Sequence, residues 1–310
     1  NPLARGLWAA MKTISIEQSQ IEFRLKLGDQ SLAFEQQDID LDSAQEFVWP
    51  NGATVLISGG LGELGLLVAA DIAARSTGST LILLGRRTPG EDDLARIESL
   101  KRVGANAVHR VCDIADLQQV QQIVAEYPDI RIVVHAAGLI DDALVANKSN
   151  ASIDRVLAPK VQGIVNLDRA TAACPLDHFI AFSSMAGALG NAGQFDYAAG
   201  NGYMDAYIEQ RAQRVLAQQA RGRSLSINWP LWEEGAMQLD TASRESLAKT
   251  FGIKPLPTAE GLKALRLAIA SPHTQLMTLY GQRSAHAALF APPKAPVEQQ
   301  TQQSPVELDK

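Results

Sequence analysis

Short apolar runs rich in β-branched residues recur along the chain, separated by polar or glycine-containing segments. Strands that are covered on both faces of a parallel sheet have this continuous apolar pattern. Helical segments fit between them, so the pattern predicts an α/β fold with a parallel sheet of about seven strands. The predicted strands span residues 53–58, 79–84, 107–113, 130–135, 177–183, 224–228 and 274–280.

Helices are predicted where apolar positions follow a period of about 3.6 residues. Two such segments span residues 66–75 and about residues 196–214, and a third helix begins near Ser152 and contains Lys160. Near the start of the sequence, residues 3–12 have helical periodicity, and residues 20–26 alternate like a half-exposed strand.

The first predicted strand leads directly into Gly59-Gly-Leu-Gly-Glu-Leu-Gly65, which opens the next helix. Glycines let the backbone approach a pyrophosphate, and the helix N-terminus supplies free N–H groups and positive partial charge. Glycine loops also serve as ordinary turns, but the strand before and the helix after favour a dinucleotide site. We therefore expect a Rossmann-like, doubly wound sheet that binds its cofactor at Gly59, Gly60, Leu61, Gly62 and Leu64.

The second predicted strand ends in Gly85-Arg86-Arg87 and not in a carboxylate. An acidic residue at this place holds the ribose hydroxyls of NAD, whereas an arginine accommodates the extra phosphate of NADP. Arg86 and Arg87 therefore predict NADPH as the cofactor. The alternative is that both are solvated surface charges.

Two later strand ends would complete the cofactor site. Asp113, which Ile114 follows, could accept a hydrogen bond from the adenine amino group, or it could cap the next helix. The small side chains of Ala136, Ala137 and Gly138 would let the nicotinamide ribose lie against the backbone. His135, just before them, can be a buried, hydrogen-bonded core histidine, and we do not assign it to catalysis.

The segment Tyr197-Ala-Ala-Gly-Asn201 indicates the chemistry of the site. Many nucleotide-dependent reductases begin a helix with Tyr-x-x-x-Lys, and here asparagine stands at the lysine position. Positions four apart share a helix face, so Tyr197 and Asn201 can point at one substrate. A tyrosine can donate its proton to a ketone oxygen during hydride transfer, and a nearby ammonium lowers its pKa. Ser184 would be a second donor, and we hypothesise that Lys160 supplies the ammonium.

Composition narrows the expected partners and compartment. The chain of 310 residues has 46% hydrophobic residues and a net charge of −6, which offers no basic face for nucleic acid. The sequence has neither a signal peptide nor a run of about eighteen apolar residues, so we expect neither secretion nor a membrane span. Its two cysteines, Cys112 and Cys174, suggest reduced thiols in a cytoplasmic setting.

Together these residues resemble the catalytic part of a ketoreductase domain from a modular polyketide synthase, in the short-chain dehydrogenase/reductase superfamily. The resemblance covers about Asn51 to Phe290. Besides the glycine loop it rests on His135-Ala-Ala-Gly138, Ala158-Pro-Lys160, Phe182-Ser-Ser184, Tyr197-Ala-Ala-Gly-Asn201 and Asn228-Trp-Pro-Leu-Trp232. That family has lysine and asparagine exchanged relative to its relatives, as in this sequence. The resemblance implies Tyr197 as proton donor and Ser184 as carbonyl anchor, with Lys160 and Asn201 supporting the proton relay.

The resemblance also implies a substrate and a stereochemical outcome. The substrate would be a β-ketoacyl chain on the phosphopantetheine arm of an acyl carrier protein, with neighbouring synthase domains as further partners. Ile140-Asp141-Asp142 stands where B-type members have Leu-Asp-Asp, and Leu189 lies where A-type members have a tryptophan, so we expect a D-configured β-hydroxyl. Ile140 departs from the usual leucine, and the acidic pair could instead cap the following helix.

The segment around Trp232 resembles the substrate lid of the family. Trp229 and Trp232 offer broad apolar surface for an acyl chain, or they pack into the core without contacting a ligand. Gly235 would permit a hinge in a lid that spans residues 231–255.

We expect three parts in the chain. Residues 1–50 resemble a truncated remnant of the structural subdomain of polyketide ketoreductases, residues 51–290 form the NADPH-binding catalytic domain, and residues 291–310, rich in proline and glutamine, form a flexible linker. Two alternative functions are a free-standing short-chain alcohol dehydrogenase and a catalytically silent domain kept for scaffolding or carrier binding.

Overall fold

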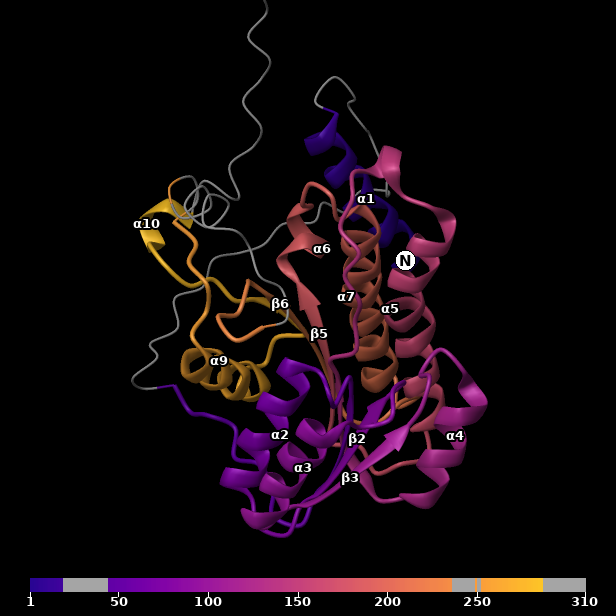
Figure 1. Ribbon diagram of the computed structural model, residues 1–310, viewed down its shortest axis with the longest axis vertical. Coiled ribbons are helices and arrows are strands. Elements are labelled where there is room, and N and C mark those ends of the chain that lie inside the picture. The colour runs from indigo at the N-terminus through magenta and orange to yellow at the C-terminus, as the bar shows by residue number, and fades with distance from the viewer. Residues whose placement is uncertain (19–43, 236–248, 250–251, 287–310) are drawn as a thin grey trace, which may run out of the picture.

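A computed structural model describes residues 1–18, 44–235, 249 and 252–286. In this part of the chain, seven parallel strands form one sheet in the order β3-β2-β1-β4-β5-β6-β7 (Figure 1). The predicted Rossmann-like, doubly wound fold is therefore confirmed. The strands are β1 (Thr54–Ser58), β2 (Thr80–Gly85), β3 (Asn106–Val111), β4 (Ile130–His135), β5 (His178–Ser184), β6 (Arg223–Trp229) and β7 (Gln275–Met277).

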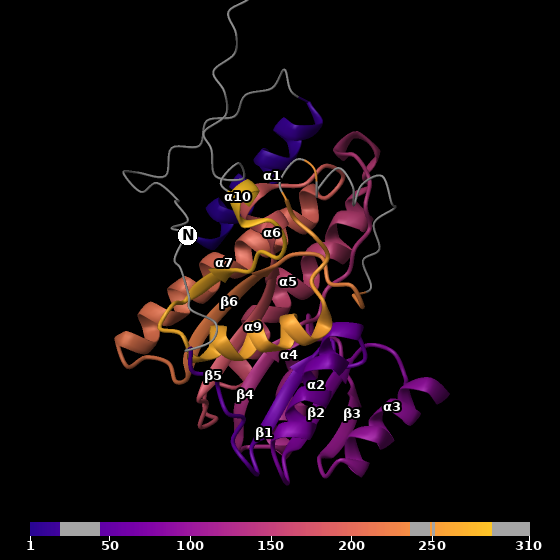
Figure 2. The same ribbon diagram turned by 90° about the vertical axis from the view of Figure 1, so that its left-hand side faces the viewer.

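Helices cover both faces of the sheet, as the two ribbon views show (Figures 1 and 2). The α-helices are α1 (Pro2–Glu17), α2 (Glu63–Arg75), α3 (Glu91–Arg102), α4 (Leu117–Glu126), α5 (Asn150–Ala170), α6 (Met185–Leu189), α7 (Phe195–Leu216), α9 (Thr258–Ala270) and α10 (Arg283–His286). A short 3-10 helix, η1, spans Val145–Asn147.

Alternate residues of each central strand point to opposite faces, so each apolar run contributes to two cores. From β1, Val55 and Ile57 join a buried cluster with side chains of α2, α3 and α9. Leu56, between them, belongs to a second cluster with side chains of α4, α5 and α7. Because both faces are covered, most residues of β1, β2 and β4 are apolar, which is the pattern that the sequence shows.

The order of the strands reverses between β1 and β4. The chain builds β1, β2 and β3 toward one edge of the sheet and then crosses back to continue with β4 on the other side of β1. At such a switch point the connections after two neighbouring strands diverge, which leaves a crevice at their carboxyl ends. The segments that begin at Gly59 and at Ala136 follow β1 and β4, so they lie at this crevice.

Small residues let α1 lie directly against α7. A Cβ atom added at Gly6 would lie 2.8 Å from the Ala199 carbonyl oxygen, and one added at Gly202 would lie 2.9 Å from the Ala9 Cβ atom. Ala9 and Ala10 are buried in the same contact. Residues near the start of the chain are therefore packed onto the helix that carries Tyr197.

The structure agrees with most predicted elements and corrects a few boundaries. The helix predicted at residues 66–75 begins earlier, at Glu63, because Gly62 serves as its N-cap. β7 is shorter than the predicted strand at residues 274–280, because only three of its residues pair with β6 before the chain turns toward Gly281, whose φ is +134°. The predicted strand at residues 20–26 and the linker at residues 291–310 lie outside the described residues, and the division into three parts stays a prediction.

Replacing Gly6 with valine should destabilise the fold, because the new side chain would meet the backbone of α7. We expect the free energy of unfolding to fall by about 1–3 kcal/mol, as overpacked sites do. Denaturant unfolding of Gly6→Val measures this, and Leu3→Val, on an exposed position of the same helix, is the matched control. Equal unfolding midpoints for the two variants would contradict the close packing of α1 on α7.

Candidate active site

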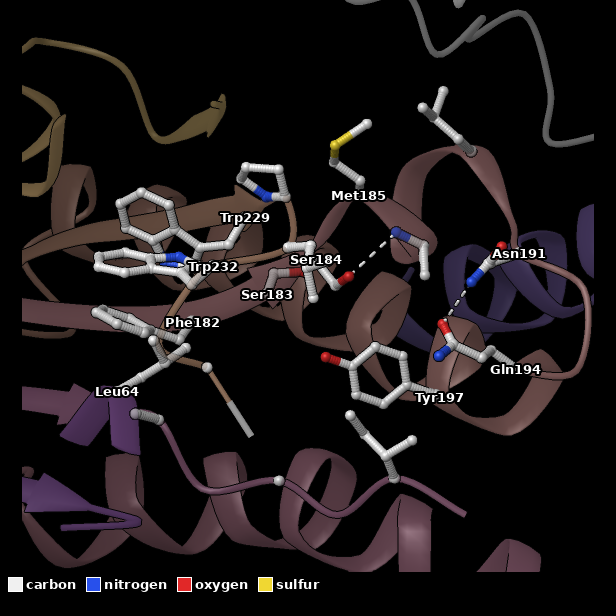
Figure 3. Close-up of a pocket in the computed structure, with 18 of the residues that line it drawn as sticks. Leu64, Phe182, Ser183, Ser184, Met185, Asn191, Gln194, Tyr197, Trp229 and Trp232 are labelled. Atoms are coloured by element: carbon white, nitrogen blue, oxygen red, sulfur yellow. Dashed lines mark hydrogen bonds between the residues drawn. The ribbon is translucent and has the colours of Figure 1, made fainter. Parts of the chain in front are cut away.

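A cavity of about 620 Å³ opens at the carboxyl ends of the strands. At one end it is lined by the glycine loop after β1, and at the other by the segment from Leu189 to Gln194 that precedes α7. Figure 3 shows Phe182, Trp229 and Trp232 together on one side, with Asn191 and Gln194 across the cavity from them. The hollow therefore connects the predicted cofactor site with the predicted catalytic residues.

Tyr197 and Ser184 meet in this cavity from two neighbouring elements. Ser184 ends β5 and caps α6, where its Oγ atom accepts a hydrogen bond from the Ala186 N–H at 3.2 Å. Tyr197 lies in the first turn of α7, and its hydroxyl points toward Ser184 (Figure 3). Two hydroxyl groups are thus available to one oxygen atom of a bound molecule.

Lys160, from α5, extends toward Tyr197 between two glycines. Its Nζ atom donates a hydrogen bond of 3.0 Å to Asn201 Oδ1 and lies 5.0 Å from the centre of the Tyr197 ring. Glycines border the lysine side chain, since a Cβ atom at Gly200 would lie 3.0 Å from its Cδ atom and one at Gly138 would lie 3.3 Å from Nζ. The four residues predicted from sequence are therefore brought together.

Asn201 joins the lysine to the backbone of α7. While its Oδ1 atom accepts from Lys160, its Nδ2 group donates to the Tyr197 carbonyl oxygen at 2.7 Å. Asn201 is fully buried, so both polar ends of its side chain are used. Asn201 lies one helical turn after Tyr197, where many nucleotide-dependent reductases have lysine, and it hydrogen-bonds the lysine that α5 supplies instead.

The pKa values of Lys160 and Tyr197 are both shifted by burial. Burial lowers the pKa of Lys160 to about 8, and the charge of Asp205 opposes this shift. Burial raises the pKa of Tyr197, while hydrogen bonds with Ser184 and Asn201 oppose the rise. The sequence led us to expect a lowered tyrosine pKa, but the loss of water around the phenol outweighs its polar contacts. Tyr197 consequently keeps its proton at neutral pH.

The glycine loop forms a cradle whose walls are backbone. Gly59 has φ +73°, and a Cβ atom there would lie 2.8 Å from the Ala137 backbone, on the loop after β4. A Cβ atom at Gly65 would lie 2.3 Å from the Gly59 carbonyl oxygen. Gly62 caps α2 without a side-chain hydrogen bond in the described residues, which leaves the helix N–H groups open to an anion. The residues present therefore fit the pyrophosphate of a dinucleotide.

Comparison with known proteins places the chain in a family. Residues 53–234 match the family model described as "KR domain". This chain belongs to the ketoreductase (KR) domain family. Domains of this family are oxidoreductases that bind NAD(P)H, in agreement with the cradle and the cavity.

Several multidomain synthases contain a similar segment. The polyketide synthase ThaG of Burkholderia thailandensis is 41% identical over 283 residues, which is 86% of this chain and 5% of ThaG. The polyketide synthase PksN of Bacillus subtilis is 37% identical over 252 residues, which is 78% of this chain and 5% of PksN. The chain thus spans a small part of these relatives.

A solved structure shares the fold over nearly the whole chain. The crystal structure of a ketoreductase domain from the bacillaene assembly line matches with a TM-score of 0.84 and 33% identity, covering 94% of this chain and 77% of that one. The predicted resemblance of this chain to the ketoreductase domains of polyketide synthases is therefore confirmed.

Arg86 and Arg87 of the ketoreductase differ in their surroundings. Arg87 forms a double contact with the Asp93 carboxylate at the start of α3, with 2.7 Å from Nη2 to Oδ1. Arg86 is exposed, and among the described residues its side chain has no hydrogen bond or ion pair. The guanidinium of Arg86 is therefore available to a ligand, whereas that of Arg87 is already engaged.

Asp113 does not cap the helix that follows it. The N-cap of α4 is Asp116, while Asp113 Oδ1 accepts a hydrogen bond of 3.0 Å from the Ala115 N–H within the turn before the helix. That alternative is wrong, because the turn places Asp113 three residues too early. Ile114, beside it, is buried, and a Cβ atom at Gly163 would lie 2.7 Å from its Cδ1 atom.

His135 is a core histidine, which confirms that reading. It is fully buried, and its Nδ1 atom shares a hydrogen bond of 2.7 Å with Ser58 Oγ. Burial, with the charge of Lys160 nearby, lowers the pKa of His135 to about 3. The imidazole is therefore neutral across the physiological range.

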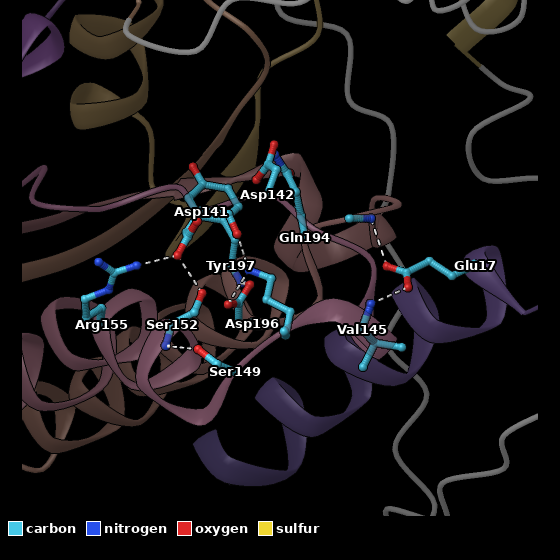
Figure 4. Close-up of polar contacts among 12 residues, drawn as sticks. Glu17, Asp141, Asp142, Val145, Ser149, Ser152, Arg155, Gln194, Asp196 and Tyr197 are labelled. Atoms are coloured by element: carbon cyan, nitrogen blue, oxygen red, sulfur yellow. Dashed lines mark hydrogen bonds and ion pairs between the residues drawn. The ribbon is translucent and has the colours of Figure 1, made fainter.

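The acidic pair at positions 141 and 142 binds side chains and does not cap a helix (Figure 4). Asp141 accepts from the Ser152 hydroxyl at 2.6 Å and pairs with Arg155 at 2.5 Å, and Asp142 accepts from Gln194 at 2.9 Å. The capping alternative is wrong, since Leu144 and Ser149 hold the N-cap positions of η1 and α5. Ile140, before the pair, lines the cavity.

A buried ion pair joins the same loop to α7. The Lys148 ammonium contacts the Asp196 carboxylate at 2.6 Å, and both side chains are 1% exposed. Asp196 immediately precedes Tyr197 and accepts a hydrogen bond from its N–H at 2.8 Å. Sequence reasoning missed this contact, which connects the loop after β4 to the start of α7.

Trp229 and Trp232 are packed into the core and also line the cavity, so the acyl-chain contact stays a prediction. They are 4% and 3% exposed, and their rings meet edge to face with centres 5.1 Å apart. Most of the predicted lid beyond Gly235, at residues 236–248, 250 and 251, lies outside the described residues, so the lid stays a prediction.

Sequence reasoning also missed Asp205, a buried carboxylate on α7. It accepts hydrogen bonds from the Ser226 hydroxyl at 2.6 Å and from Asn228 Nδ2 at 2.8 Å. The same Asn228 group donates to the Ser184 carbonyl oxygen at 3.0 Å. The available signal was spacing, because Asp205 lies one helical turn after Asn201 on the same face.

The described residues meet the requirements of neither a metal site nor a membrane-spanning helix. Within them, no group of histidine, cysteine and acidic side chains is arranged to hold a metal ion. None of their helices is both long enough and apolar enough to cross a bilayer. Cys112 and Cys174 are buried free thiols, as we expected, and burial raises the pKa of Cys112 to about 11.

Replacing Lys160 with methionine should stabilise the folded domain near pH 7, because it removes a buried charge. The folded-state pKa of about 8 lies below the ordinary 10.5, so the cost of the ammonium is fully present below pH 8. That cost disappears as the pH rises toward 10.5. We expect Lys160→Met to raise the free energy of unfolding by about 1–2 kcal/mol at pH 7 and by less at pH 9.5.

Denaturant unfolding at several pH values measures this difference. Lys101→Met, on the exposed surface of α3, is the control and should change the stability little. A methionine variant that is less stable than the parent at every pH would show that the ammonium contributes to stability.

Proposed function

We propose that this domain uses NADPH to reduce the β-keto group of an acyl chain that an acyl carrier protein holds as a thioester. One observation carries the proposal: the Tyr197 and Ser184 hydroxyls converge in a cavity that continues from the glycine cradle, with the Lys160 ammonium beside the tyrosine ring. A pair of hydroxyls alone would be ordinary. Joined to a dinucleotide cradle, they fit the reduction of a carbonyl group.

Each of the four residues has a defined task in this reaction. The bound nicotinamide cofactor supplies the hydride. Ser184 and Tyr197 donate hydrogen bonds to the ketone oxygen and so stabilise the negative charge that develops on it. Tyr197 then transfers its proton to that oxygen, which a phenol with a raised pKa still holds at neutral pH.

Lys160 and Asn201 support the tyrosine after the proton leaves. With a pKa of about 8, Lys160 is largely an ammonium at pH 7 and favours the phenolate that forms. Asn201 fixes the ammonium through its Oδ1 atom and ties it to the Tyr197 carbonyl through its Nδ2 group. The proton returns to the tyrosine from solvent between turnovers.

We propose that the residues at the end of β2 make the domain prefer NADPH over NADH. The residues that directly follow this strand are Arg86 and Arg87, and no carboxylate occurs before Glu91. The exposed guanidinium of Arg86 can pair with that phosphate, as arginine does in NADP sites. Asp113 and Ile114 would border the adenine, and Ala136, Ala137 and Gly138 the nicotinamide ribose.

The loop at residues 140–142 supports a B-type assignment with a D-configured product. Ile140 and Tyr197 line the cavity, and Asp142 accepts a hydrogen bond from Gln194, which also lines it. Leu189, in place of the A-type tryptophan, also lines the cavity. The relatives are parts of large synthases, so we place the carrier protein and neighbouring synthase domains as partners in the cytoplasm.

Incubating the domain with NADPH and a carrier-bound β-ketoacyl thioester tests the proposal. We expect NADPH consumption and a product two mass units heavier, with the D configuration in chiral analysis. Tyr197→Phe should lower the rate by about 10²-fold or more while the dissociation constant of NADPH stays within about twofold, because only the proton donor is lost.

A wild-type domain that binds NADPH without turnover would favour the silent, carrier-binding alternative. Activity on small free ketones with none on carrier-bound thioesters would favour the free-standing alcohol dehydrogenase. Undiminished activity of Tyr197→Phe would refute the role of this tyrosine.

Replacing Arg86 with alanine should weaken NADPH binding more than NADH binding, because only NADPH carries the 2′-phosphate. We expect about a tenfold loss in NADPH affinity, with NADH affinity nearly unchanged. Fluorescence titration of both cofactors measures this. Arg87→Ala is the matched control and should have the smaller effect, since Arg87 already pairs with Asp93. An equal loss of both cofactors in Arg86→Ala would contradict the assignment.

A further inference from the structure

Two loops border Tyr197, and one carboxylate from α1 holds both of them. We call residues 139–149, after β4, the acidic loop, and residues 190–194, before α7, the helix-entry loop. Glu17 Oε2 accepts a hydrogen bond from the Val145 N–H in the acidic loop at 2.8 Å. Its Oε1 atom accepts one from the Gly193 N–H in the helix-entry loop, also at 2.8 Å. Figure 4 shows the carboxylate between the two donors.

Hydrogen bonds to an ionised carboxylate are stronger than those between neutral groups. Both donors are backbone N–H groups, so the contact positions the main chain of each loop. The loops also meet directly, because the Ala143 N–H donates to the Gly193 carbonyl oxygen at 3.0 Å. Glu17 thus completes a three-way junction of α1 and the two loops.

The last turns of α1 support the segment before α7 at further points. The Lys12 ammonium donates to the Ala188 carbonyl oxygen at 2.6 Å, and Thr13 Oγ1 accepts from the Asn191 N–H at 3.1 Å. Gly190, with φ +77°, lies so close that a Cβ atom there would be 2.9 Å from the Thr13 nitrogen. The helix-entry loop therefore follows the surface of α1.

This junction borders the cavity at its substrate end. Ile16, the neighbour of Glu17, lines the cavity and is 53% exposed. Leu189, Gly190, Asn191 and Ala192 line the same end. The glycine cradle, in contrast, is formed by the segments after β1 and β4, and the structure shows no contact between Glu17 and its residues among those described.

We infer that Glu17 is a positioning residue for ketone reduction, which holds the acidic loop and the helix-entry loop in the register that orients the substrate against Tyr197 and Ser184. The inference rests on the proposed function. A reacting group displaced by about 1 Å can lose about 10²-fold in rate, so fixing these loops matters for the chemical step and for which face of the ketone is presented. Cofactor binding should depend on Glu17 little.

Two substitutions and a matched control distinguish the positioning of the two loops from a general contribution of α1 to the stability of the fold. Glu17→Ala removes both acceptors, and Glu17→Gln keeps one acceptor oxygen but turns an NH2 group toward the second N–H. Glu209→Gln is the control, because Glu209 on α7 pairs with Arg5 of α1 at 2.8 Å and touches neither loop. The control removes a charged contact between α1 and α7 without releasing the loops.

We expect kcat with a carrier-bound β-ketoacyl thioester to fall about tenfold in Glu17→Ala and by less in Glu17→Gln, with the KM for NADPH within about twofold. The excess of one hydroxyl configuration in the product should decrease in the same order. Glu209→Gln should keep the kcat and the configuration of the parent protein. Glu17 variants that match Glu209→Gln in both properties would overturn the inference.

Site-resolved amide exchange tests the junction without any substrate. The Val145 and Gly193 amides should exchange faster in Glu17→Ala than in the parent, and at the parent rate in Glu209→Gln. Unchanged exchange at both amides would overturn the inference even if the rates of reduction fell. A parent domain that fails to reduce the thioester would overturn the proposed function, whereas an active parent with unaffected Glu17 variants would overturn the inference alone.

Discussion

The Lys160 ammonium is buried beside the ring of Tyr197, and the surrounding structure has to accommodate this charge. Burying a charge is costly unless it is paired and hydrogen-bonded. The lysine side chain passes between Gly138 and Gly200, where a Cβ atom would be in tight contact with it, and its ammonium donates a hydrogen bond to Asn201. Asp205 opposes the effect of burial from further along α7. The residues around this ammonium come from the loop after β4 and from neighbouring positions on α7.

The buried charge explains why the site is built from several chain segments and not from one motif. When lysine is one helical turn from tyrosine, a single helix carries both groups. Here the lysine comes from α5 and the tyrosine from α7, so their separation depends on how these helices pack against β4 and β5. The buried Lys148–Asp196 pair adds a second tie between the acidic loop and the start of α7. Removing one member of such a pair would leave an uncompensated buried charge, so losing this tie would be strongly destabilising.

The sequence was sufficient for the fold and for the residues with local signals. Apolar runs revealed the central strands because both of their faces are buried, and the glycine loop revealed the cradle because a strand precedes it and a helix follows it. Glu17 could not be predicted, since its partners are backbone groups more than a hundred residues away and carry no side-chain signal. Asp113 was ambiguous for a related reason, because whether an aspartate caps a helix depends on where the preceding turn ends. The rise in the pKa of Tyr197 required knowledge of its burial, which no motif contains.

The packing of α1 on α7 has a consequence for exchanging such domains between synthases. A transplanted segment that began at residue 51 would contain the cradle, the four central residues and the whole sheet, and by its motifs it would look complete. It would nevertheless lack Glu17, whose carboxylate accepts hydrogen bonds from the Val145 and Gly193 N–H groups. It would also lack α1, against which Gly190 packs. The junction for a graft is therefore set by a contact between helices, at a point in the chain well before the first strand.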